Sequence, residues 1–101
     1  MRKSTIMMLK PILRDGNHPL WRSIEHTFKS FKSTSKNQKY SYMDYYKMLR
    51  MHLVEGRPWG DIGVSFGMAY NTGMVVIPKR INVYLNLCND VSVYINTVHH
   101  D

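Results

Sequence analysis

Lysines and aromatic residues alternate over residues 26–42, HTFKSFKSTSKNQKYSY, a stretch without a carboxylate. Its four lysines are Lys29, Lys32, Lys36 and Lys39. Cations at this spacing can meet the phosphates of a nucleic-acid backbone, and aromatic rings that are free to stack can hold the bases of a single strand. The segment therefore predicts contact with a polyanion.

Helical spacing separates the two kinds of side chain. We expect a helix over residues 19–33, because apolar residues recur there every three or four positions and so share one face. That apolar stripe consists of Trp21, Ile24, Phe28 and Phe31. Since the stripe is needed for the core, its rings are not available for bases, and Tyr40 is the better stacking candidate. The lysines fall on the flank of the helix and in a polar linker over residues 33–39.

The positive charge is concentrated in one part of the sequence. The net charge is +7, and residues 1–39 hold nine basic residues against two acidic ones, whereas residues 40–101 hold five of each. Such asymmetry predicts an acidic partner. Lysine-dominated contact gives backbone affinity rather than base readout. We therefore expect a small nucleic-acid-associated protein that binds the phosphate backbone of DNA or RNA with little sequence specificity. The expected contact residues are Arg22, Lys29, Lys32, Lys36, Lys39, Tyr40, Lys79 and Arg80.

A basic surface can equally dock on an acidic protein. The alternative hypothesis is therefore a protein-binding adaptor, inhibitor or assembly component that docks on an acidic partner surface. The sequence does not indicate an oligomeric state. A single alanine among many Tyr, Met, Lys and Asn residues is typical of AT-rich coding sequences, which include those of phages.

Catalytic and metal-binding patterns are weak, so we expect no enzyme, no cofactor and no metal. The seven carboxylates form no evident pair, and Cys88 has no nucleophile signature around it. His99, His100 and Asp101 read as a solvated tail. One cysteine gives no internal disulfide and suits a reducing cytoplasm, which is the host cytoplasm if the source is a phage. No run of eighteen apolar residues is present, so no membrane partner is expected.

The expected fold class is α+β, with residues 1–101 as a single small domain and residues 1–16 extended or mobile. Ser41 and Asp44 match a helix-capping pattern and predict a second helix that stops near Gly56. After that point apolar residues alternate, which is the period of strands. The predicted strands are 64–70, 74–77, 81–88 and 91–95, with a hairpin loop at residues 71–73 and a strand end at Pro78. Two amphipathic helices would then pack on one face of a three- or four-stranded antiparallel meander.

Overall fold

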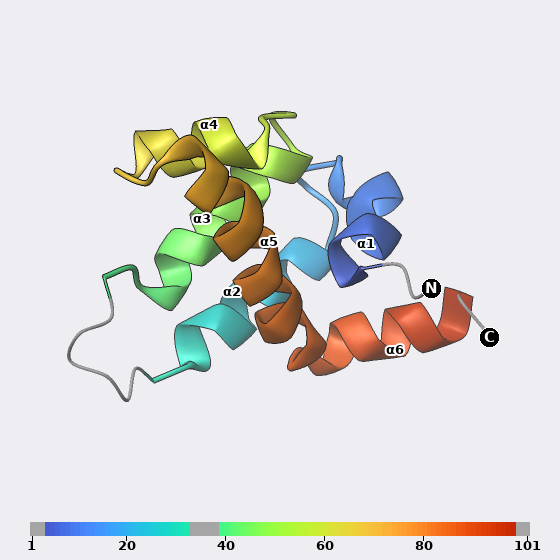
Figure 1. The fold of residues 1–101 in the computed structure, drawn as a ribbon. Coiled ribbons are helices and arrows are strands. Elements are labelled where there is room, and N and C mark those ends of the chain that lie inside the picture. Colours follow the sequence, from blue (N-terminus) through green and yellow to red (C-terminus); the bar gives the residue numbers. More distant parts are fainter. Residues whose placement is uncertain (1–3, 33–38, 99–101) are drawn as a thin grey trace.

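The computed structural model describes residues 4–32 and 39–98, and these residues fold around one long central helix (Figure 1). The helices are α1 (Thr5–Leu13), α2 (Leu20–Ser30), α3 (Tyr42–Leu53), α4 (Trp59–Ser65), α5 (Tyr70–Asn86) and α6 (Asn89–Val98). In Figure 1, α4 lies across the upper end of α5, and α6 projects to the right from its lower end. The buried core lies between α5 and the helices that pack on it, and it extends between α2 and α3.

The predicted strand meander is wrong, because the described residues beyond Gly56 form helices and contain no strand. The burial pattern along α5 explains the error. Ile77, Ile81 and Leu85 are fully buried, whereas Val83 is 55% exposed and Leu87 is 62% exposed. These three buried residues are spaced by four positions. Residues at that spacing share a face in a strand and nearly share one in a helix, so their burial fits either structure. Only the exposure of the other apolar residues, such as Val83, distinguishes a helix from a strand here.

Two residues that were expected to break a strand lie inside α5 instead. Gly73 was placed in a hairpin loop, and Pro78 was read as a strand end, but both are helical. Pro78 lacks the N–H of one helical hydrogen bond, and the buried side chains of Ile77 and Ile81 beside it hold the helix to the core. Tertiary packing therefore outweighs the local cost of the proline.

The two predicted helices are confirmed as α2 and α3. The Ser41 hydroxyl accepts a hydrogen bond from the backbone N–H of Asp44 at 3.0 Å, and the Asp44 carboxylate accepts one from the backbone N–H of Ser41 at 2.9 Å. This reciprocal capping box satisfies two amide groups that the first turn leaves without partners. In α2, Trp21, Ile24 and Phe28 of the apolar stripe are buried as expected.

Residues 5–13, within the segment expected to be extended or mobile, form α1 and pack against α5. The backbone N–H of Ile6 donates to the Asn82 side-chain carbonyl at 3.0 Å, and the Thr5 hydroxyl donates to the side chain of Asn86. Leu9 and Leu13 are fully buried. The N-terminal helix is thus part of the core.

Candidate nucleic-acid interface

Helices α4 and α5 form a helix-turn-helix unit, with residues 66–69 as the turn. Gly67 has a φ of 89°, a left-handed conformation that L side chains rarely adopt. The backbone N–H of Gly67 donates to the carbonyl of Val64 at 3.0 Å, and that of Met68 donates to the carbonyl of Gly63 at 2.8 Å. These bonds satisfy carbonyls at the end of α4 and set the direction of the chain into α5.

The two helices of this unit approach each other closely at two glycines. A Cβ atom added to Gly63 would lie 2.8 Å from the Cα of Gly73, and one added to Gly73 would lie 3.0 Å from the Cα of Gly63. Both contacts are to backbone atoms, which cannot rotate away. Any larger residue at either position would therefore push α5 away from α4.

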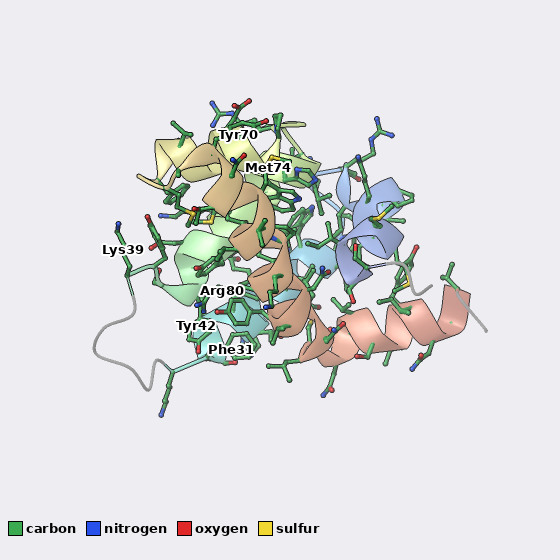
Figure 2. The ribbon with its side chains drawn as sticks, viewed as in Figure 1. Phe31, Lys39, Tyr42, Tyr70, Met74 and Arg80 are labelled. Atoms are coloured by element: carbon green, nitrogen blue, oxygen red, sulfur yellow. The ribbon has the colours of Figure 1, made fainter. Side chains whose placement is uncertain are left out.

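The first turns of α5 present an exposed face that combines apolar and amide side chains. We call Tyr70, Asn71, Met74 and Val75 the outer face. Tyr70 is 46% exposed, Met74 is 49% exposed, Val75 is 66% exposed, and Asn71 is also exposed. Figure 2 shows Tyr70 and Met74 on the same side of the start of α5. The ring of Tyr70 packs over Gly60, where an added Cβ would clash with it.

Contacts from α3 and the residues before it hold the unit in place. The Tyr40 hydroxyl donates to the backbone carbonyl of Phe66 at 2.5 Å, which attaches the start of α3 to the turn. At the other end of α3, the ring of His52 stacks on Trp59, with 3.8 Å between the ring centroids. Burial of His52 lowers its pKa, although its hydrogen bond to the carbonyl of Arg57 acts in the opposite direction.

A cavity of about 580 Å³ lies between the beginning of α3 and the flank of α5. Four tyrosines and two cations contribute to its wall, and its described lining contains no carboxylate. The lining residues are Lys39, Tyr40, Tyr42, Tyr45, Gly67, Met68, Thr72, Val76, Arg80 and Tyr84. Burial raises the pKa of Tyr45, an effect that the neighbouring Arg80 opposes. In Figure 2, Phe31, Tyr42 and Arg80 gather on one side of α5, and Lys39 lies farther out.

The structure brings together only some of the predicted contact residues. Lys39, Tyr40 and Arg80 line this cavity, and Lys79 is exposed on α5. Arg22 lies on α2 beside a different cavity of about 450 Å³. These residues therefore do not form one continuous site.

The remaining predicted lysines lie in or near α2. Lys29 pairs with Glu25 at 3.6 Å, and Lys32 is exposed just beyond the helix. Because both partners of the ion pair are exposed, the pair adds only about 0.3–0.5 kcal/mol to stability and leaves the Lys29 ammonium accessible. Lys36 lies outside the described residues. The half-buried Tyr40 ring has its hydroxyl engaged by Phe66, so its role in the observed structure is to position the turn.

The outer face is not evident from the sequence. The spacing of Gly60, Gly63 and Gly67 is visible in the sequence, but it matches no phosphate-binding loop motif and so does not by itself indicate a site. The relevant signal combines a small residue at position 63, a glycine at position 67 and apolar residues on both sides of that glycine. This combination indicates two helices joined by a tight turn only when residues 70–86 are assigned to a helix.

Comparison of the chain with protein-family models, curated proteins and solved structures finds no match. Over residues 4–32 and 39–98, no helix combines the length and the apolar character needed to cross a membrane. In the same part of the chain, no three His, Cys, Asp or Glu side chains gather as a metal site would require. The helix-turn-helix unit and the cavity beside it are therefore the candidate sites of the described residues.

Proposed function

We propose that the protein binds duplex DNA, with the outer face of α5 in the major groove. The observation that carries this proposal is the exposed start of α5 within a tightly held helix-turn-helix unit. In DNA-binding units of this kind, the N-terminal residues of the second helix contact base edges, and the neighbouring elements contact the backbone. Tyr70, Asn71, Met74 and Val75 occupy the corresponding part of α5.

The chemistry of the outer face favours A·T base pairs. An asparagine amide can bond to both N6 and N7 of adenine, and apolar side chains can contact the methyl group of thymine. Asn71 supplies the amide, and Met74 and Val75 supply the apolar groups. Lys79 lies one turn after Val75 and is exposed, which supports a role for it in contacting a phosphate. With one amide and no arginine fork on the outer face, we expect modest sequence preference added to backbone affinity.

The direct test is fluorescence anisotropy with labelled duplexes of A·T-rich and G·C-rich sequence, measured over a range of salt concentrations. Affinity should fall with salt, with a log–log slope of about −0.9 for each phosphate contacted. Lys79→Ala should reduce that slope by about 1 and weaken all duplexes alike, whereas Asn71→Ala should relax the A·T preference by about 1–3 kcal/mol.

Val83→Ala is the matched control, because Val83 is exposed on the same helix away from the outer face. It should leave both the affinity and the base preference unchanged. Absence of duplex binding at low salt would refute the proposal. Equal affinity for single strands and duplexes would also refute it, because a single strand has no major groove.

A protein partner with an acidic surface is the second candidate, and the apolar content of the outer face is the observation that favours it. Tyr70, Met74 and Val75 could insert into a protein groove as anchors spaced for one side of a helix. This candidate predicts that a single protein partner is recovered from the source lysate after nuclease treatment. Partner loss on replacing Met74 by Asp would locate the contact. Both candidates suit a cytoplasmic protein with a single cysteine.

A further inference from the structure

We propose that the cavity beside α5 is a binding site for a small aromatic anion of the mononucleotide class. The side chains of α5 that line the cavity are Thr72, Val76, Arg80 and Tyr84, which recur every fourth residue and so share one side of the helix. The outer face, centred on Met74 and Asn71, points in a different direction. The cavity is therefore separate from the surface proposed to enter the DNA groove.

The charge of the lining selects for an anion. Lys39 and Arg80 are the charged groups among its described residues, and both are positive. Arg80 is exposed, and a hydrogen bond to the buried Tyr84, which raises the pKa of Arg80, holds its guanidinium at the edge of the cavity. A guanidinium offers paired N–H donors that match two oxygens of a phosphate or carboxylate. The cavity thus has an anion-binding edge supplied by α5.

The tyrosines of the lining supply rigid walls for an aromatic ring. The ring of Tyr84 packs edge-to-face against Tyr42, with 5.0 Å between centroids, and against Tyr45, with 5.6 Å between centroids. Tyr40 and Tyr42 are half-buried and leave part of each ring open to a ligand, whereas Tyr45 and Tyr84 are buried and pack behind them. Burial raises the pKa of Tyr45, so its phenol stays neutral near pH 7. Neutral phenol rings favour contact with a planar apolar group, because aromatic pairs gain energy beyond the area they bury.

The size of the cavity fits such a ligand. Small-molecule sites have volumes of roughly 300–1,000 Å³ and combine apolar walls with a few polar groups. The volume here is about 580 Å³. Aromatic walls, one cationic edge and this volume together indicate a ligand with one ring system and one phosphate-like group.

The test titrates AMP, GMP, CMP and UMP separately into the full chain, with binding followed by calorimetry and by backbone amide NMR shifts. Adenosine and inorganic phosphate are titrated in parallel. Saturable binding of at least one mononucleotide, with shifts at Met68, Thr72 and Val76, is the expected result, and neither adenosine nor phosphate should saturate over the same concentrations. Arg80→Gln should weaken binding at least about tenfold, because a hydrogen bond to a charged group contributes about 1.5–3 kcal/mol.

Two further variants separate loss of the site from loss of the fold. Thr72→Trp fills the cavity from an exposed position and should abolish binding while the helical circular dichroism is unchanged. Val83→Ala should bind as the wild type does. The inference is overturned if no mononucleotide binds, or if inorganic phosphate binds as tightly as the mononucleotides.

A backbone phosphate of duplex DNA is the other source of the same anionic chemistry. If a short duplex shifts Met68, Thr72 and Val76 and the mononucleotides do not, the cavity belongs to the DNA contact and the inference is wrong. Mononucleotide binding by a protein that fails to bind any duplex would leave this inference standing and refute only the proposed function.

Discussion

Replacing Gly73 with alanine tests the close approach of α4 and α5 on which the proposed interface depends. An added Cβ would lie 3.0 Å from both the Gly63 Cα and the Trp59 carbonyl oxygen, and 3.4 Å from the Gly63 nitrogen. All three are backbone atoms, so relief requires the two helices to separate. Alanine at an unobstructed helix position is favoured over glycine by about 1 kcal/mol. Overpacking costs about 1–3 kcal/mol, and because backbone atoms cannot rotate away we expect the upper part of that range, about 2–3 kcal/mol. The net loss in the free energy of unfolding is then about 1–2 kcal/mol.

The measurement is urea denaturation followed by the helical circular dichroism signal, with Val75→Ala as the control. Val75 is on the same helix and 66% exposed, so its replacement should change the free energy of unfolding by no more than about 0.5 kcal/mol. Helix propensity alone would make Gly73→Ala stabilising. The sign of the change in the free energy of unfolding therefore shows whether α4 and α5 meet closely at Gly73. An alanine variant as stable as the wild type, or more stable, would show that the helices do not meet at this glycine.

Three further predictions concern the fold and its pH dependence. Ile81→Ala should cost about 2–5 kcal/mol and Val83→Ala less than about 0.5 kcal/mol in the same denaturation assay; equal losses would fit the strand alternation instead. Ser41→Ala should remove the capping box and cost about 1 kcal/mol, and an unchanged midpoint would exclude that role. Because burial lowers the pKa of His52 in the folded protein, the unfolded chain binds its proton more readily, so the melting temperature should rise with pH up to about 6.5 and then level off. His52→Gln should flatten that rise, and an identical pH profile would exclude His52 as its source.

The helices that could be predicted from sequence are those whose signals are local. Ser41 and Asp44 define the start of α3 through their own side chains, and the stripe from Trp21 to Phe28 has a spacing that no strand shares. The segment that became α5 lacks such signals. It is rich in β-branched residues, contains Gly73 and Pro78, and has no side-chain cap at its start. Its helical state depends on burial against other helices, which a single sequence does not display.

The same limit applied to the candidate site. Arg80 and Lys39 could be selected by charge alone, since the type of residue is enough to suggest contact with an anion. Asn71 and Val75 could not be selected in this way, because they share an exposed face only if residues 70–86 form a helix. Arg22 and Lys29 of α2 were expected to form one contact surface with Lys39 and Arg80. Arg22 lies instead beside another cavity. The sequence shows which residues are charged, whereas only the folded structure shows which of them lie close together.

The pairing of α1 with the end of α5 has a consequence for the order in which the protein assembles during synthesis. Helix α1 can dock only after Asn82 and Asn86 have emerged from the ribosome, because these residues accept its hydrogen bonds. Until then Ile6, Leu9 and Leu13 have no surface on α5 to cover. Closing so long a stretch of chain is entropically costly and slow compared with forming local contacts. In a nascent chain, residues 5–13 should therefore stay sensitive to proteases until residues 82–86 have emerged, and should then become resistant in a single step.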